Sequence, residues 1–240
     1  MLVMSKKCFL VFAYSMVGLL ASCNNNNVRF DDKEINPEAI YFDYKIWGDE
    51  ERNHLTVRLQ YRLGDSEGPT WLIPDPGKVE LDGELMEPDS SKRNGVWYEL
   101  SKPLDEFEGK HVIVFTNYND KEYKEEFDFK AISLKREIPA VINRDDLVFE
   151  LDGLNPEDQI RVLLTDTAFY SRGIDRVDTL RNGRIHVSLQ DLENLKNGPV
   201  AIEFYKEMEK HLKETTSEGG RLSISYGLKR VFELRDAPNR

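Results

Sequence analysis

Apolar and polar residues alternate along several stretches of the chain after residue 38. Residues 55–63, LTVRLQYRL, alternate strictly, and apolar residues recur with the same period in residues 40–46 and 123–129. Successive side chains of a β-strand point to opposite faces, so this period predicts strands with one buried and one solvated face. The first half of the chain is therefore expected to be rich in β-structure.

Turn signals separate these strands and divide the chain. Asp82-Gly83 lies between two short apolar runs and is typical of a tight β-hairpin. The strand pattern restarts beyond a polar stretch at residues 135–137 and the helix- and strand-breaking Pro139. The expected fold is all-β: two tandem immunoglobulin-like antiparallel β-sandwich domains, residues 39–134 and residues 135–240.

Three segments of the second half predict local features. Ser188 can cap a helical turn that carries Leu192 and Leu195, with Gly198 ending it. Gly227, inside the last apolar strand pattern, predicts a β-bulge. The polar stretch at residues 207–220 predicts a long exposed hairpin, with a short helix as the alternative.

The first 23 residues differ from all that follow. Lys6 and Lys7 precede an apolar run at residues 8–20, which has the length of a signal-peptide core and is short for a transmembrane helix. The run ends in LASC at residues 20–23, which resembles the lipobox of bacterial lipoprotein precursors. The resemblance implies a signal peptide at residues 1–22, cleavage after Ser22 and a lipid-modified, acylated Cys23. A plain secretory signal and an uncleaved anchor are the alternatives.

We expect residues 23–38 to comprise the lipidated cysteine and a flexible tether, because four asparagines and a charged stretch with Pro37 follow Cys23. In Gram-negative lipoproteins an aspartate directly after the lipidated cysteine often marks retention in the inner membrane. This chain has Asn24 at that position, so the outer membrane is the expected location. The sequence does not predict whether the protein faces the periplasm or the cell surface. The whole chain is similar to Gram-negative lipoproteins with immunoglobulin-like domains, a resemblance that assigns no functional residue.

Charge and cysteine content narrow the classes of partner. The net charge is -11, and residues 24–134 alone carry 14 basic and 25 acidic residues, a balance of -11. Such acidity disfavours nucleic acid and bare anionic lipid headgroups as partners. The two cysteines are Cys8 and Cys23, so the predicted mature domains contain no disulfide and depend on their apolar core.

The chain shows no catalytic motif. Its four histidines are scattered without metal-ligand spacing, and His111 and His186 are expected on the solvated faces of strands. No Gly-x-Ser-x-Gly elbow, phosphate loop or thiol nucleophile is present, and no cofactor is expected. Asp166, Asp175 and Asp178 bracket a loop and are candidates for calcium ligands, although they lack the spacing of a calcium-binding loop; a solvated acidic loop is the alternative.

Aromatic residues supply the candidate binding residues. Exposed indoles stack on sugars or anchor protein partners, although tryptophan in a sandwich usually lies in the core. Of Trp47, Trp71 and Trp97, we favour Trp71 because it lies in a proline-rich, loop-like stretch. Tyr170 and Arg172 form a second candidate in the loop before Gly173.

These observations favour a membrane-anchored, non-catalytic binding or assembly protein with an envelope protein or a glycan as its partner. A structural envelope protein without a specific ligand is one alternative. A glycan hydrolase that uses a carboxylate pair is the other, and it requires a cleft with two carboxyl groups about 5–10 Å apart.

Overall fold

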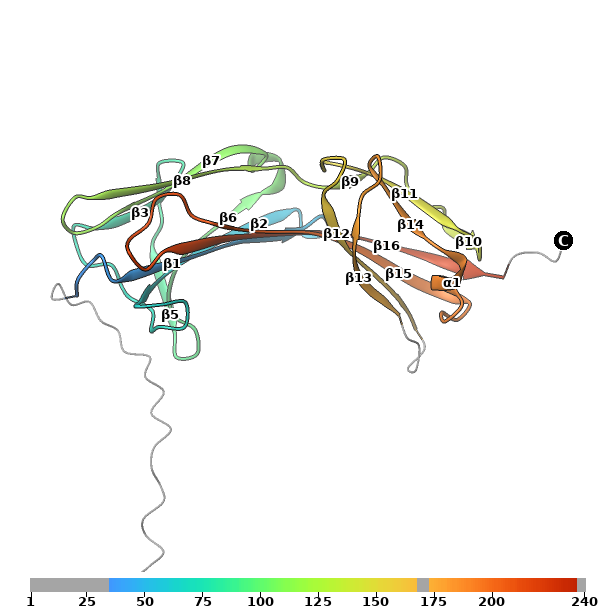
Figure 1. The fold of residues 1–240 in the computed structure, drawn as a ribbon, viewed down its shortest axis with the longest axis horizontal. Helices are drawn as coiled ribbons and strands as arrows, with labels where there is room; N and C mark the ends of the chain where they lie inside the picture. The colour runs from blue at the N-terminus through green and yellow to red at the C-terminus, as the bar shows by residue number, and fades with distance from the viewer. Residues whose placement is uncertain (1–34, 168–172, 237–240) are drawn as a thin grey trace, which may run out of the picture.

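The computed structural model describes residues 35–167 and 173–236, and most of this part is β-structure (Figure 1). The strands are β1 (Ile40–Asp49), β2 (His54–Leu63), β3 (Lys78–Leu81), β4 (Glu84–Leu85), β5 (Pro88–Ser91), β6 (Gly95–Pro103), β7 (Gly109–Thr116), β8 (Glu122–Phe129), β9 (Ser133–Leu134), β10 (Val141–Asn143), β11 (Leu147–Asp152), β12 (Gln159–Asp166), β13 (Ile174–Thr179), β14 (Arg184–Val187), β15 (Gly198–His211) and β16 (Gly220–Arg235). The helical elements are the 3₁₀ turn η1 (Leu104–Glu106) and the short helix α1 (Leu189–Leu192). The prediction of an all-β fold is confirmed.

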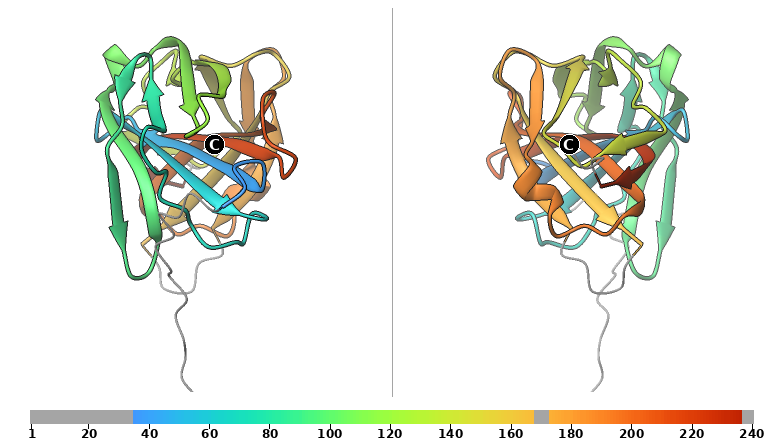
Figure 2. Two further views of the ribbon diagram at one scale, coloured as in Figure 1. Left: turned by 90° about the vertical axis from the view of Figure 1, so that its left-hand side faces the viewer. Right: turned by 90° about the vertical axis from the view of Figure 1, so that its right-hand side faces the viewer.

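Within the described residues, the strands form one large and two small sheets. The large sheet runs β13-β12-β15-β16-β1-β2-β6-β5, and β10 pairs with the distal part of β16. The small sheets, β4-β3-β7-β8 and β14-β11-β9, lie over the same face of the large sheet, one over each half (Figures 1 and 2). Each half is therefore a β-sandwich, as expected, but the two sandwiches share a sheet.

The large sheet continues across the predicted boundary after residue 134. β15 and β16 form a long antiparallel hairpin, and the first part of β16 also pairs in parallel with β1, from Phe42 opposite Gly220 to Asp49 opposite Gly227. The hairpin predicted at residues 207–220 is present, yet Leu212 and Leu222 are buried, so this end of it is not simply exposed. The predicted boundary after residue 134 would place β16 in the second domain, although β16 also pairs with β1 of the N-terminal sandwich.

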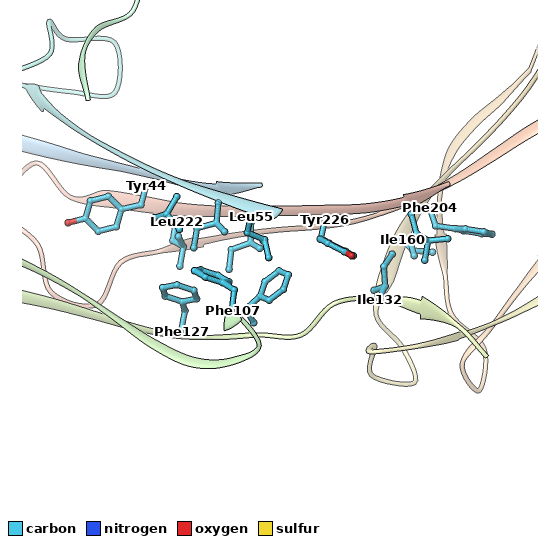
Figure 3. Close-up of a cluster of buried hydrophobic side chains, with 14 of the residues drawn as sticks. Tyr44, Leu55, Phe107, Phe127, Ile132, Ile160, Phe204, Leu222 and Tyr226 are labelled. Carbon is cyan, nitrogen blue, oxygen red and sulfur yellow. The ribbon is translucent and has the colours of Figure 1, made fainter. Parts of the chain in front are cut away.

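A single hydrophobic cluster runs through both halves (Figure 3). In the N-terminal half it is aromatic: the Phe42 ring lies 5.3 Å from the rings of Phe115 and Tyr123 and 5.4 Å from Tyr61. Edge-to-face ring pairs add about 0.5–1.5 kcal/mol beyond the burial of their area. Figure 3 shows Tyr226 between Leu55 and Phe107 of the N-terminal half and Ile132, Ile160 and Phe204 on the C-terminal side, so the two halves have a continuous interior.

Two of the predicted local features are confirmed. Asp82 and Gly83, with φ of 53° and 82°, form the tight turn between β3 and β4. Ser188 caps α1 in a capping box with Asp191, each side chain accepting a hydrogen bond from the other's backbone N–H. Leu192 and Leu195 are buried, which ties this turn to the core. Gly198 does not end the turn as predicted, because α1 ends at Leu192 and Gly198 begins β15.

The predicted bulge at Gly227 is wrong, because the pairing of β15 with β16 runs through Tyr205 opposite Gly227 without interruption. The reason for glycine is a neighbouring ring. A Cβ at position 227 would lie 2.5 Å from Cε1 of Tyr205, closer than any real contact. Glycine therefore makes room for the Tyr205 side chain.

The prediction for His111 is also wrong, whereas His186 is exposed as expected. The His111 side chain is buried beneath the β3–β4 turn, where Nδ1 lies 2.7 Å from the Asp82 carboxylate and Nε2 lies 2.8 Å from the backbone carbonyl of Phe107. The imidazole also stacks on the Phe107 ring at 4.1 Å. His111 is in phase with the buried Ile113 and Phe115 of β7, and two polar partners and one ring partner satisfy it on this interior face.

The predicted signal peptide, the lipidation site Cys23 and most of the tether lie outside the described residues. Across residues 35–167 and 173–236, the structure contains no helix that is both long enough and apolar enough to cross a bilayer.

Candidate binding site

One face of the large sheet is covered by neither small sheet, and we call it the open face (Figure 1). In β1 and β2 the buried core residues alternate with polar or aromatic residues that point to this face. The open-face residues of β1 include Asp43, Lys45 and Trp47, and those of β2 include Arg58 and Arg62. The open face is the part of the N-terminal half that can meet a ligand without disturbing the core.

Two tryptophans flank an arginine on this face. Arg58 of β2 pairs across the sheet with Lys45 on one side and Glu99 on the other, and the tryptophans are its diagonal neighbours. Its guanidinium carbon lies 5.2 Å from the centre of the Trp47 ring and 4.9 Å from that of Trp97, while Nε donates to a Glu99 carboxylate oxygen at 2.7 Å. Each cation–π contact contributes about 0.5–1 kcal/mol at exposed sites. These contacts fix Arg58 and both indoles in place.

A groove of about 700 Å³ opens beside this cluster. Its floor is formed by Lys45, Trp47, Arg58, Gln60 and Arg62 of β1 and β2. Its walls are two loops that project from the sheet, residues 67–70 and the turn at residues 93–94. The volume is typical of sites for small ligands, about 300–1,000 Å³.

Side chains of the floor hold the walls in position. Gln60 Nε2 donates to the carbonyls of Asn94 and Val96 at 2.9 and 3.2 Å, and Arg62 Nη1 donates to the Gly68 carbonyl at 3.1 Å. The two walls are also joined, because the Val96 N–H donates to Thr70 Oγ1 at 2.7 Å. The groove is therefore preformed, which lowers the entropic cost of binding.

A second hollow, of about 490 Å³, adjoins the groove on the side of β15 and β16. Lys45 and Trp47 line both hollows, and Glu207, Glu209 and Ser223 line only the second. Trp47 is partly exposed and stands between the two hollows. A ligand longer than the groove would cross this indole.

Two of the four cations that line the groove, Lys45 and Arg62, pair with one buried carboxylate. Asp43 lies under the open face, with Lys45 Nζ at 3.2 Å, Arg62 Nε at 3.5 Å and Arg221 Nε at 3.0 Å from its oxygens. Burial opposes the charge on Asp43, but the hydrogen bond from Arg221 and the charges of Lys45 and Arg221 outweigh burial and hold its pKa below the ordinary 3.8. Asp43 is thus an anion that anchors three cations near the groove.

The favoured sequence candidate, Trp71, is not a contact residue. Its side chain is fully buried and its ring packs 6.4 Å from that of Tyr118. The nearby prolines marked a loop correctly, but this loop folds inward. The better signal was the phase of β1: Trp47 is out of phase with the buried Tyr44 and Ile46, so the alternation predicts it on the opposite face. No such signal exists in β6, where residues 95–98 are all buried and Trp97 itself is only 8% exposed.

The three calcium candidates do not converge. Asp166 accepts from the Lys196 N–H at 2.6 Å, Asp175 accepts two hydrogen bonds from Arg161, and Asp178 accepts from Arg176 at 2.9 Å. Among residues 35–167 and 173–236, no three histidine, cysteine or acidic side chains are grouped so that they could hold a metal ion. These carboxylates serve local hydrogen bonds and ion pairs instead. Tyr170 and Arg172 lie outside the described residues.

No protein-family model and no curated protein matches this chain. Solved structures with some likeness include DIP-gamma IG1+IG2, at 8% identity and a TM-score of 0.23, covering 82% of this chain and 96% of that one. The fibronectin(III)-like modules of Clostridium thermocellum CbhA align at 6% identity and a TM-score of 0.24, covering 84% and 99%. Bacteroides ovatus SGBP-B in complex with a mixed-linkage heptasaccharide aligns at 10% identity and a TM-score of 0.19, covering 72% and 53%. TM-scores in this range do not establish a common fold, so a functional proposal has to rest on the surface of this chain.

Proposed function

We propose that this protein is a lipid-anchored, non-catalytic binding protein of the cell envelope, and that its open face holds a glycan. The observation that carries the proposal is the partly exposed indole of Trp47, which is fixed by Arg58 between two hollows of the same face. The lipobox-like LASC sequence and the tether that follows it support the envelope location.

The chemistry of the groove suits a sugar better than a flat protein surface. Sugar rings present C–H groups that pack on an indole and hydroxyl groups that pair with amides and guanidinium groups. The groove offers both kinds of contact, since Trp47 lines it together with Gln60, Arg58 and Asn94. Its loops are held by hydrogen bonds, so a weakly binding ligand does not have to order them.

Two carboxylates of the open face near the Trp47–Arg58–Trp97 cluster, Asp43 and Glu99, are engaged in ion pairs, which supports a binding role. Glu99 accepts from Arg58, and Asp43 is surrounded by three cations with a side chain only 1% exposed. A carboxylate whose pKa is lowered in this way is a poor general acid, the role that a hydrolytic pair needs one member to fill.

The test is a glycan array probed with the purified full-length protein, followed by titration calorimetry on any glycan that binds. Trp47→Ala is expected to weaken binding by about tenfold, because loss of an aromatic contact of about 1.4 kcal/mol corresponds to that factor. Leu85→Ala is the matched control: it also removes an exposed large apolar side chain, from the small sheet on the other side of the core. Thermal melting establishes that both variants are folded.

Two results would contradict the proposal. One is an array on which no glycan binds above background. The other is a bound glycan whose affinity is the same for the wild type, Trp47→Ala and Leu85→Ala, since the contact would then lie elsewhere.

A further inference from the structure

We propose that the groove selects an acidic sugar, a short oligosaccharide that carries carboxylate or sulfate groups. This inference rests on the proposed glycan-binding function and specifies its ligand. Its basis is the charge of the groove, which is opposite to that of the protein around it.

Positive side chains dominate the groove. Lys45, Arg58, Arg62 and Arg93 line it, against a single acidic residue, Glu67. The protein as a whole carries a net charge of -11, and residues 24–134 account for the same value. Four cations gathered in one hollow of so acidic a chain form a local site of positive potential, which attracts an anion from solution.

The internal ion pairs leave part of this charge available. Lys45 and Arg62 share the carboxylate of Asp43 with Arg221, which also lies 4.0 Å from Glu209. The Asp43 side chain is 1% exposed, whereas the Lys45 side chain is 43% exposed. Arg93 lies at the exposed tip of a wall and has no ion pair among the described residues. Arg58 alone is matched one to one, by Glu99. The groove therefore presents more positive than negative charge to a ligand.

The donors also have a geometry that suits carboxylate and sulfate. A guanidinium group offers a planar pair of N–H donors that match two oxygens of such a group. Arg93 in the wall and Lys45 in the floor are both free of backbone contacts that would consume their donors within the described structure. An acidic group bound between them would leave its sugar ring near Trp47, which lines the same groove.

The surroundings limit the ligand to a short one. The groove measures about 700 Å³, and Glu207 and Glu209 line the second hollow beyond Trp47. A continuous polyanion that extended past the groove would meet these carboxylates and the negative field of the rest of the chain. The groove thus favours one or two acidic groups at the end or side of a sugar chain over a long polyanion.

The experiment compares matched pairs of sugars on the full-length protein by calorimetry. Tri-galacturonate and its neutral methyl ester form the carboxylate pair, and a sulfated trisaccharide with its desulfated counterpart forms the sulfate pair. We expect at least one acidic member to bind about tenfold or more tightly than its neutral partner. Its affinity should fall as ionic strength rises from about 0.05 to 0.5 M, where screening shortens the reach of charge from more than 10 Å to less than 5 Å.

Arg93→Ala and Lys92→Ala provide the matched variants. Both residues are exposed in the same turn, but only Arg93 lines the groove, and neither substitution touches the core. Arg93→Ala is expected to weaken binding of the acidic sugar about five-fold and binding of the neutral partner by a clearly smaller factor, so that the preference for the acidic sugar falls. Lys92→Ala is expected to have less than a two-fold effect.

The outcomes separate this inference from the function on which it rests. Equal binding of acidic and neutral partners, reduced by Trp47→Ala, would overturn the charge selection and leave glycan binding in place. Preference for the acidic sugar that is equally sensitive to Lys92→Ala and Arg93→Ala would also overturn it, because general surface charge would then be the cause. Absence of binding to every sugar of the array and of these pairs would overturn both proposals.

Discussion

Asp43 shows how a charge can be held beneath a binding surface. A carboxylate withdrawn from water is costly, and the cost is met here by Lys45, Arg62 and Arg221. The aspartate also joins strands, since Lys45 lies on β1 beside it, Arg62 on β2 and Arg221 on β16. Removing its charge would leave three like-charged side chains close together, so Asp43 stabilises both the sheet and the arrangement of the groove.

Asp43→Asn is expected to lower the free energy of unfolding at pH 7 by about 3 kcal/mol, in the range for breaking a buried ion pair. The pKa of Asp43 is lowered in the folded protein relative to the ordinary 3.8, so the native state binds fewer protons than the unfolded state near that pH. The stabilisation is therefore present above about pH 4 and is lost as pH falls through the lower folded pKa. Urea denaturation of both proteins at pH 7 and pH 3 measures this.

The difference in stability between wild type and Asp43→Asn should shrink between those two pH values. Asp105→Asn, at an exposed position in η1, is the matched control and is expected to change stability by less than about 0.5 kcal/mol. A difference for Asp43→Asn that stays constant from pH 7 to pH 3 would show that its effect is steric rather than electrostatic.

At the scale of elements, local pattern predicts local structure well. Alternation predicts β1, β2 and β8, Asp82-Gly83 predicts a turn, and Ser188 predicts a capped helical turn, because each depends on residues near in sequence. The parallel pairing of β1 with β16 joins residues about 178 positions apart, such as Phe42 and Gly220. The hydrophobic periodicity of the sequence cannot predict a pairing over this distance. For the candidate site, the phase of Trp47 was readable, but the approach of the loop at residues 67–70 to the turn at residues 93–94 was not.

The β15–β16 hairpin offers a test of why Gly227 is a glycine. In Gly227→Ala the new Cβ would collide with the Tyr205 ring, whose hydroxyl donates to a Glu203 carboxylate oxygen at 2.6 Å. We expect a loss of about 1–3 kcal/mol in the free energy of unfolding, the usual cost of overpacking. Guanidinium denaturation of the two single variants and of Gly227→Ala/Tyr205→Ala forms a double-mutant cycle.

In the Tyr205→Ala background the alanine at position 227 should be neutral or slightly stabilising, because the ring is gone and glycine weakens a strand interior. The two changes are thus expected to be strongly non-additive. Additive effects would mean that the Tyr205 ring moves aside freely and that the glycine has another role.

On the scale of the whole molecule, the shared sheet makes the two halves dependent on one another. β16 supplies Leu222 and Tyr226 to the N-terminal core and Phe232 and Leu234 to the C-terminal part, all in one strand. The buried cluster is continuous through Tyr226 and Ile132 (Figure 3). Two tandem domains joined by a linker would instead have separate cores, and each could unfold without the other.

We therefore expect one cooperative unfolding transition for the whole chain. Trp47, Trp71 and Trp97 all lie in the N-terminal half, so tryptophan fluorescence reports that half, while far-UV circular dichroism reports both. The two signals should give the same midpoint.

Phe204→Ala removes a fully buried side chain of the C-terminal half. It should lower the midpoint of the fluorescence transition by about 10 °C, because about 3–5 kcal/mol is lost from the free energy of unfolding of the whole structure. Val231→Ala is the control, because Val231 lies on the same hairpin but is 62% exposed; it should change the fluorescence midpoint by less than about 2 °C. Separate midpoints, or a fluorescence transition that Phe204→Ala does not move, would mean that the halves unfold independently despite their common sheet.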